Sequence, residues 1–207
     1  MSLPKRLAKF LLSPWIRSRG PRGCVYLTFD DGPDATHTRA VLDALRRYHV
    51  KATFFMVGEE MERRPDIVAE VRAQGHVIGF HSYSHRHLSD HSGTEALDDL
   101  RQTAAVAQRF GLEFKLYRPP YGELSWRRVL WCAWHGVRIV MWSLDSRDSF
   151  VATAGELTQQ LAPGRVRDGD IVLLHDDTAV TVTALPGVIE GLQHEGLRFG
   201  VLAKHRP

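Results

Sequence analysis

Cysteine is scarce in this chain of 207 residues, which has only Cys24 and Cys132. Both thiols lie among apolar residues, so we expect them in the core, with no disulfide framework, as is compatible with a reducing compartment. Internal repeats, low-complexity tracts and linker-like stretches are also lacking. These absences exclude a disulfide scaffold, a repeat protein and a disordered chain. With 43% apolar and 25% charged residues, the sequence is typical of one soluble globular domain with a substantial core.

Acidic residues are absent before Asp30, although six basic residues precede it: Lys5, Arg6, Lys9, Arg17, Arg19 and Arg22. Without these six, the remaining 21 basic and 24 acidic residues give a net charge of −3, whereas the whole chain has +3. The sequence pI of about 9.0 is therefore a property of the amino-terminal residues. No basic face with interleaved aromatic residues occurs elsewhere, so we expect no nucleic-acid partner.

We interpret residues 1–22 as a basic amphipathic arm in front of one domain over residues 23–207. The arm's apolar run is short and lacks a small-residue cleavage site, so it is a poor secretory signal and too short to span a bilayer. Leu7, Phe10 and Leu11 recur at helical spacing between basic residues, as in helices that lie in a membrane interface. Two interpretations remain open: residues 1–20 contact a membrane surface, or, as we favour, a solvated arm docks its apolar residues on the domain. We expect a cytoplasmic location, with contact at the inner face of the membrane as the alternative.

Short apolar runs alternate with longer amphipathic stretches from residue 24 onward. The pattern predicts strands over 24–30, 52–57, 76–81, 114–118, 138–144, 170–175 and 198–203. It predicts helices over 36–48, 64–74, 94–110, 125–135, 154–162 and 182–194. Such alternation indicates a parallel sheet with right-handed crossovers, either an open doubly wound sheet or a closed barrel. Both architectures place functional residues at the carboxyl ends of the strands.

Ionisable residues end five of the seven predicted strands. They are Asp30 with Asp31, His81, Arg118, Asp145 and His175. Two adjacent carboxylates repel each other and are costly to desolvate, so the segment "TFDDGP" alone would be typical of a solvated turn. Because the other ionisable residues converge on the same edge of the sheet, we favour a functional site there.

The segment "HSYSH" places His81 and His85 four residues apart at a strand end, where two imidazoles can point to one ion. With one carboxylate from "TFDDGP" they make a two-histidine, one-carboxylate set, which suits a catalytic zinc ion with a position left for water. The other histidines show no such pattern, and we expect them to be structural or exposed: His37, His49, His76, His87, His91, His135, His194 and His205.

The second carboxylate of "TFDDGP" could stay free of the metal and take a proton from metal-bound water. Arg118 in "YRPPYG" is the expected cation beside it, on a loop stiffened by Pro119 and Pro120. His175 ends the apolar run "IVLLHDD", and Asp145 could orient it and keep it charged, which would make it a general acid. The alternatives are an ordinary surface arginine and a satisfied core or rim histidine.

The segments "TFDDGP", "HSYSH", "RPPYG", "DSRD" and "LLH" occur in this order between residues 24 and 205. Together they resemble the five motifs of the NodB-homology polysaccharide deacetylases, carbohydrate esterase family 4. The resemblance implies a distorted (β/α)₇ barrel and metal-dependent removal of acetyl groups from N-acetylated sugars. It also implies roles: Asp30 as base, Asp31, His81 and His85 as metal ligands, Arg118 as the residue that holds the base, His175 as acid with Asp145 as its partner, the Tyr121 amide as an oxyanion donor, and Leu173 in the acetyl-methyl pocket.

One segment departs from the family pattern, in which Asp-Trp is common where this chain has Asp148, Ser149 and Phe150. That tryptophan usually forms part of the groove wall, so Trp142 or Phe150 would have to replace it.

On this resemblance we expect a hydrolase that removes N-acetyl groups from N-acetylglucosamine-type sugars in a glycan, giving acetate and a free amino sugar. The expected cofactor is a divalent metal ion, Zn²⁺ in first place, with Co²⁺, Ni²⁺ or Mn²⁺ as alternatives. A second enzyme class is a deacetylase or deformylase of a lipid-linked amino sugar in envelope glycan biosynthesis, which the basic arm favours. The rival outside enzymes is a catalytically silent glycan-binding module, which would be expected to have lost a ligand, base or acid; none is missing from this sequence.

Overall fold

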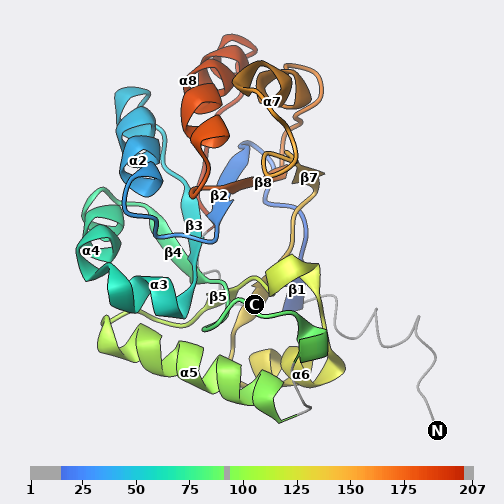
Figure 1. Ribbon diagram of the computed structural model, residues 1–207. Helices are drawn as coiled ribbons and strands as arrows, with labels where there is room; N and C mark the ends of the chain where they lie inside the picture. The colour runs from blue at the N-terminus through green and yellow to red at the C-terminus, as the bar shows by residue number, and fades with distance from the viewer. Residues whose placement is uncertain (1–14, 91–93, 203–207) are drawn as a thin grey trace, which may run out of the picture.

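The computed structural model describes residues 15–90 and 94–202, which form one parallel sheet surrounded by helices (Figure 1). The strands are β1 (Ile16–Arg17), β2 (Tyr26–Asp30), β3 (Thr53–Met56), β4 (Val77–Phe80), β5 (Leu116–Tyr117), β6 (Arg138–Val140), β7 (Leu144–Asp145) and β8 (Ile171–His175). The α-helices are α2 (His37–Arg47), α3 (Gly58–Arg63), α4 (Pro65–Ala73), α5 (Glu95–Arg109), α6 (Trp126–Trp134), α7 (Ala154–Gln160) and α8 (Ala179–His194). Two short 3₁₀ turns, η2 (Leu88–Asp90) and η3 (Pro120–Gly122), complete the described elements.

The sheet has the strand order β1-β6-β5-β4-β3-β2-β8-β7, with every pair parallel. One continuous stretch of chain links the two edges of the sheet. β6 pairs with the edge strand β1, and β7, which follows β6 after a few residues, pairs with β8 at the other edge. Between them, Met141 N donates to Arg17 O over 2.7 Å and Ser143 N donates to Ile171 O over 3.0 Å. The sheet is therefore curled into a half-barrel, which confirms the prediction of a distorted barrel.

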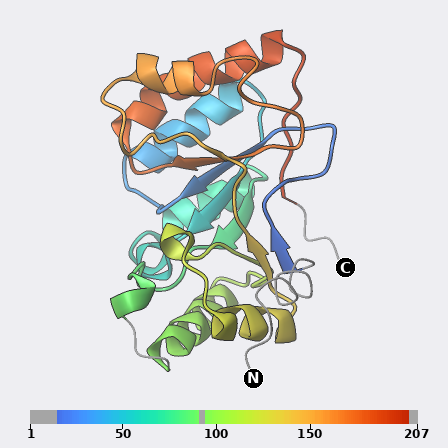
Figure 2. The same cartoon turned by 90° about the vertical axis from the view of Figure 1, so that its right-hand side faces the viewer.

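The core lies between the sheet and its outer helices. Every residue of β2 and β3 is buried, as expected for central parallel strands covered on both faces. Helix α2 turns Val41, Leu42 and Leu45 inward, and these apolar side chains join the largest buried cluster. Figure 2 shows α7 and α8 at one end of the molecule and α5 and α6 at the other, with the strands between.

Two of the predicted strands differ from the structure. Residues 198–203 form no strand within the described residues: Val25 and Phe199 make a single bridge, and Leu202 N donates to the Thr53 side chain instead of a strand backbone. The predicted strand 138–144 is split, because the backbone at Met141–Ser143 turns from one neighbour to another.

β1, the strand that the sequence did not predict, lies in the segment 1–22 that we interpreted as an arm. β1 pairs with β6 through Ile16 and Arg17, so these residues belong to the sheet. Residues 1–14, which include Leu7, Phe10 and Leu11, lie outside the described residues. Within the described ranges, no helix is both long enough and apolar enough to cross a bilayer.

The predicted convergence of strand ends is present. Asp30 ends β2, His175 ends β8 and Asp145 ends β7, while His81 and Arg118 directly follow β4 and β5. Because the strands are parallel, these residues share the carboxyl edge of the half-barrel.

Candidate active site

A cavity of about 370 Å³ opens at the carboxyl edge of the sheet. Eight of the nine site residues predicted from the sequence line it, and Arg118 lies buried beneath them. The full lining consists of Asp30, Asp31, His81, His85, Pro119, Tyr121, Trp142, Asp145, Arg147, Asp148, Ser149, Phe150, Leu173 and His175. The structure thus gathers residues from five separate sequence segments into one pocket.

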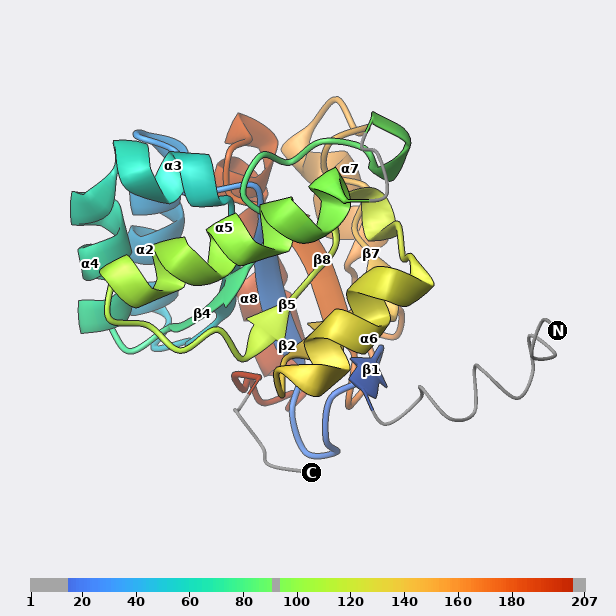
Figure 3. The ribbon, with the colours of Figure 1, turned by 90° about the horizontal axis from the view of Figure 1, so that it is seen from below.

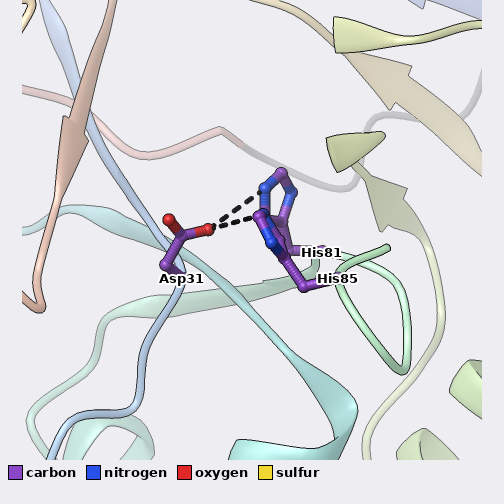
Figure 4. Close-up of side chains that lie close together, drawn as sticks. All are labelled: Asp31, His81 and His85. Carbon is purple, nitrogen blue, oxygen red and sulfur yellow. Dashed lines mark ion pairs between the residues drawn. The ribbon is translucent and has the colours of Figure 1, made fainter. Parts of the chain in front are cut away.

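Three of these side chains form a candidate metal centre (Figure 4). Asp31 Oδ1 lies 3.0 Å from His85 Nε2 and 3.4 Å from His81 Nε2. One ligand atom from each residue lies within 4.8 Å of the other two. His81 Nδ1 donates to Arg118 O over 2.8 Å, so the neutral imidazole keeps its lone pair on Nε2, the atom that faces Asp31.

The surroundings of the Asp31 carboxylate favour a bound cation. Asp31 Oδ1 is buried and accepts no hydrogen bond, an arrangement that is costly unless a positive charge compensates it. Burial alone would raise the pKa of Asp31, but His85, His81 and His175 together lower it to about 2, so the carboxylate is ionised at neutral pH. Two imidazoles and one ionised carboxylate are a donor set that divalent zinc and its neighbours accept. The residues present therefore fit a divalent metal ion.

A bend in the backbone explains how adjacent acids reach different partners. Asp30 is still part of β2, whereas Asp31 has a φ of 75°, in the left-handed region. Gly32 follows, and its N–H donates to Asp176 Oδ1 over 3.1 Å. A Cβ at Gly32 would lie 2.3 Å from the Asp176 carboxylate, so only glycine fits this close approach. In a regular strand, the Asp31 side chain would point to the face opposite to that of Asp30. The turn changes this direction.

The loop that carries His85 is held by a buried carboxylate of α5. Asp99 accepts hydrogen bonds from Tyr83 N and Ser84 N, each over 3.1 Å, and from the Ser84 hydroxyl over 2.7 Å. Ser82 Oγ accepts from His85 N over 2.9 Å. Ser82 and His85 have φ values of 68° and 52°, an uncommon backbone conformation for residues other than glycine, so these bonds fix the loop shape. The sequence analysis missed Asp99, because a helical acid carries no signal of its long-range contact.

Asp30 is paired with a fully buried arginine. Arg118 Nη1 donates to Asp30 Oδ1 over 2.7 Å and to Thr28 Oγ1 over 2.9 Å. The rest of the guanidinium donates to the carbonyls of Val140 and Met141 and lies 4.2 Å from the centre of the Phe55 ring. A buried ion pair is stable only when its remaining donors are also satisfied, as they are here. The predicted contact between Arg118 and Asp30 is thus present in the structure.

His175 has a buried carboxylate partner, but it is not the predicted one. His175 Nδ1 donates to Asp148 Oδ1 over 2.7 Å, and His175 N donates to Asp148 Oδ2 over 2.6 Å. Thr181 of α8 donates its hydroxyl to the same carboxylate over 2.6 Å. Burial by itself would lower the pKa of His175, but Asp148, Asp30 and Asp31 raise it to about 9. The imidazole is therefore protonated at neutral pH, with Nε2 3.9 Å from Asp31 Oδ2.

The predicted pairing of Asp145 with His175 is wrong. Asp145 lines the pocket, but its carboxylate accepts from Arg147 N over 2.8 Å and closes a tight turn in which Arg147 has a φ of 57°. That turn brings the next acid, Asp148, to the histidine instead. The segment "DSRD" offers two acids three residues apart, and only the turn decides which of them reaches His175.

The remaining predicted residues lie on the pocket wall. Leu173 is buried in β8, and Tyr121, with a φ of 56°, is half exposed with its ring stacked on His87 at 3.5 Å between centroids. The Tyr121 hydroxyl lies 3.4 Å from His85 Nδ1. Trp142 and Phe150, the two candidates for the missing wall tryptophan, both line the pocket, and Phe150 is 87% exposed.

The fold and this site define the class of protein. The family model for polysaccharide deacetylases matches residues 17–140, which is more than half of the chain. The chain therefore belongs to the polysaccharide deacetylase family, as the five motifs predicted.

Two of the similar relatives are named as peptidoglycan-N-acetylglucosamine deacetylases. The chain is 37% identical over 183 residues to a peptidoglycan-N-acetylglucosamine deacetylase of Bacillus cereus, covering 86% of this chain and 66% of the relative. It is 36% identical over 176 residues to a peptidoglycan-N-acetylglucosamine deacetylase of Listeria monocytogenes, covering 84% of this chain and 37% of the relative. The chain thus spans less than two thirds of the length of these relatives.

Solved structures agree with the fold. A peptidoglycan N-acetylglucosamine deacetylase in complex with 4-naphthalen-1-yl-N-oxidanyl-benzamide superposes with a TM-score of 0.88 at 34% identity, covering 96% of this chain and 99% of that one. A family 4 carbohydrate esterase from Streptomyces lividans in complex with acetate gives a TM-score of 0.79 at 32% identity, covering 88% and 94%. A family pseudoenzyme from Bacillus anthracis gives 0.84 at 25% identity, covering 91% and 68%. Since this last protein has the same fold, activity has to be argued from site residues and not from the fold alone.

Proposed function

We propose that this chain hydrolyses the acetamide of N-acetylglucosamine-type sugars in a glycan, releasing acetate and leaving a free amino sugar. The observation that supports this most strongly is the combination in one pocket of a metal-ligand set, a carboxylate paired with buried Arg118, and an imidazolium held by Asp148. These are the groups that amide hydrolysis needs: a site for activated water, a proton acceptor and a proton donor.

We propose Zn²⁺ as the ion held by Asp31, His81 and His85, with Co²⁺, Ni²⁺ or Mn²⁺ as alternatives. When bound, such an ion supplies Lewis-acid polarisation of the amide carbonyl and lowers the pKa of a water molecule. The chain contributes an oriented ligand set, because Arg118 O fixes the tautomer of His81 and Asp99 fixes the loop of His85.

Asp30 acts as the general base. Arg118 holds one oxygen of its carboxylate, and the residue also lines the pocket, where a water molecule can deliver its proton. Asp30 is a poorer candidate for the ligand role, because Arg118 already occupies its Oδ1, whereas the ligand atoms of Asp31, His81 and His85 all lie within 4.8 Å of one another. The two neighbouring acids therefore have different roles: Asp31 binds the metal and Asp30 receives the proton.

His175 acts as the general acid. With Nδ1 bonded to Asp148 and a pKa raised to about 9 by that carboxylate against the effect of burial, it holds a proton on Nε2 at neutral pH. As the water oxygen forms its bond to the carbonyl carbon, the C–N bond breaks and the amine nitrogen takes the Nε2 proton. The products are acetate and the free amine.

Two roles on the pocket wall come from the family resemblance. The Tyr121 backbone N–H would donate to the carbonyl oxygen as negative charge develops there, an effect typically worth about 3 kcal/mol per donor. Leu173, buried beside the site, would contact the acetyl methyl group. Trp142 and Phe150 would shape the wall that the sugar ring contacts.

The substrate class is proposed from the relatives, which are named for peptidoglycan. The basic arm supports a second candidate, a lipid-linked amino sugar processed at the cytoplasmic face of a membrane. We would measure acetate release from N-acetylglucosamine oligomers, peptidoglycan fragments and lipid-linked N-acetyl amino sugars, with His175→Ala as the control for background hydrolysis. Release from the first two substrates supports the glycan proposal, and release from the third alone supports the second candidate. Glycan binding without acetate release from any substrate would mean a silent module.

A further inference from the structure

Arg147 is a charged residue of the pocket that the proposed reaction does not use. It is exposed to solvent and lines the pocket, and no other lysine or arginine is among the lining residues. Within residues 15–90 and 94–202, its guanidinium forms no hydrogen bond and no ion pair, because the contacts of Arg147 come from its backbone. Arg147 therefore presents an unpaired positive charge to a molecule that enters the pocket.

The turn that carries Arg147 is fixed by its own hydrogen bonds. Arg147 N donates to Asp145 Oδ1 over 2.8 Å. Arg147 O accepts from Phe150 N over 2.8 Å and from Val151 N over 3.1 Å. These bonds hold a φ of 57°, which is uncommon for residues other than glycine. The turn connects β7 with α7, which lie next to each other in two views (Figures 1 and 3). The side chain thus starts from a fixed backbone, which lowers the entropy cost of binding.

The two acids closest to Arg147 in the sequence do not neutralise it. Asp148 is 2% exposed, and its carboxylate already accepts hydrogen bonds from His175 and from the Thr181 hydroxyl. The Asp145 carboxylate accepts from the Arg147 backbone and makes no ion pair with the guanidinium. The turn therefore separates the charge of Arg147 from both acids of its own segment.

The charges of the pocket leave Arg147 in excess when the metal site is filled. Two of the four carboxylates that line the pocket are paired with cations, Arg118 and His175. A divalent ion would balance the other two. The four carboxylates are those of Asp30, Asp31, Asp145 and Asp148. Arg147 then adds one positive charge that no lining residue offsets, and such a pocket favours a substrate with a negative charge.

The same turn exposes an aromatic ring. Phe150 lines the pocket and is 87% exposed, and the hydrogen bond from its N–H to Arg147 O joins the two residues. Ser149, at the position where the family commonly has tryptophan, has its Oγ 3.1 Å from His175 Nδ1. In this chain, one short turn therefore offers a ring on which a sugar can stack and a planar cation beside it.

We propose that Arg147 binds a carboxylate of the substrate, carried by a sugar next to the one that is deacetylated or by its substituent, while Phe150 contacts the sugar ring. This inference rests on the deacetylase function proposed above and names the class of its substrate, an anionic N-acetylated glycan. The guanidinium offers two parallel N–H donors, a geometry that fits a carboxylate. Peptidoglycan carries such carboxylates on its lactyl groups and on its peptides.

Other roles of Arg147 make less use of its charge. A hydroxyl group of a neutral sugar could accept a hydrogen bond from Arg147 but would leave the positive charge uncompensated. An arginine without a role in binding would treat charged and neutral substrates alike. The experiment below separates these cases.

The test compares one saccharide in two forms that differ only in charge. The peptide-free tetrasaccharide of alternating N-acetylglucosamine and N-acetylmuramic acid has free lactyl carboxylates, and its methyl ester has none. We would measure kcat/KM for acetate release, and Kd by calorimetry, with the zinc-loaded full chain at low ionic strength. A hydrogen bond between charged groups is typically worth about tenfold in a binding constant, so the parent should favour the free acid by about that factor. Arg147→Gln should lose this preference in both quantities.

Three further variants separate charge from packing. Arg165→Gln is the matched control, because Arg165 is exposed but lies outside the pocket, and it should keep the preference of the parent. Phe150→Ala should weaken both forms of the saccharide equally, since the ring contacts the sugar and not the charge. Arg147→Lys keeps the charge but not the two parallel donors, so its preference should lie between those of the parent and Arg147→Gln.

A second pair of substrates identifies the carboxylate. It consists of the same saccharide with its lactyl groups bonded to a short peptide, in the free-acid and the fully esterified form. An effect of Arg147→Gln in either pair supports the proposal and shows whether a lactyl or a peptide carboxylate is bound.

Two results would overturn the proposal. The parent could show equal kcat/KM and equal Kd for the charged and esterified forms of both pairs. Arg147→Gln could instead keep the full preference of the parent, which would assign the carboxylate to another group, such as the metal ion. If the parent releases no acetate from any of the saccharides, the proposed deacetylase function fails, while the ratio of Kd values still tests Arg147.

Discussion

Replacing Asp148 with asparagine should lower the pKa of the His175 imidazole and, with it, the pH above which turnover falls. His175 has a pKa of about 9 against an ordinary value near 6.5, and Asp148 is the first of the carboxylates that raise it against the effect of burial. Asparagine keeps one acceptor oxygen, which can still receive the His175 Nδ1 hydrogen bond, but it removes the negative charge. An opposite charge at hydrogen-bond distance typically shifts a pKa by about 1 to 3. Since the acid works only when protonated, we expect the alkaline limb of the pH–rate profile to move down by at least about one pH unit.

The assay is kcat/KM for one soluble N-acetylated oligosaccharide between pH 5.5 and 10, with bound metal measured in each variant. Asp145→Asn is the matched control, because Asp145 lies in the same segment and lines the same pocket but bonds to Arg147 N. It should leave the position of the alkaline limb unchanged. If Asp145→Asn moves the limb and Asp148→Asn does not, the partner predicted from the sequence is correct and the geometric reasoning fails.

Three further predictions concern Asp176, Asp99 and Gly32. Burial raises the pKa of Asp176 from 3.8 to about 7, so the folded state binds a proton that the unfolded state releases. The free energy of unfolding of the metal-free chain should therefore fall by roughly 3 kcal/mol from pH 4 to pH 7, and Asp176→Asn should lack this slope in urea titrations. Asp99→Ala should weaken metal binding about 10- to 100-fold by equilibrium dialysis, whereas Asp98→Asn, which removes an exposed carboxylate paired with Arg101, should not. Gly32→Ala should lower Tm, since its Cβ would lie 2.3 Å from the Asp176 carboxylate.

Equal slopes for the parent chain and Asp176→Asn would mean that another group accounts for the pH dependence. Equal loss of metal by the Asp99 and Asp98 variants would refute the specific role of Asp99. A Gly32→Ala variant as stable as the parent would show that the turn can open without cost.

The fold was predictable where local patterns are strong. The buried strands around Phe29, Phe54 and Leu174 are continuous apolar runs, and the helices between them carry clear amphipathic spacing. β1 could not be predicted, because two paired residues carry no periodicity and depend wholly on a partner over 100 positions away. Residues 198–203 have the composition of a strand, but within the described residues 198–202 the only bridge is between Phe199 and Val25, which precedes β2.

The site was predictable to the level of residue types at strand ends. Asp30, Asp31, His81, His85 and His175 meet as the parallel strands require. The partner of His175 was not predictable, since a tight turn at Arg147 decides between two acids of one motif. Contacts made from the sides of helices, such as those of Asp99 and Thr181, leave no trace in local sequence.

The division of roles between Asp30 and Asp31 is the central claim, and metal content is the measurement that tests it most directly. We would determine zinc per chain in the parent, in Asp30→Asn and in Asp31→Asn after dialysis against a fixed free zinc concentration, and record acetate release from the same samples. The account predicts about one ion per chain in the parent and in Asp30→Asn, with turnover of the latter reduced by about 10²- to 10⁴-fold through loss of the base. Asp31→Asn should lose the ion, because a neutral amide is a poor zinc ligand. Loss of the metal from Asp30→Asn, with metal and activity retained in Asp31→Asn, would contradict the account.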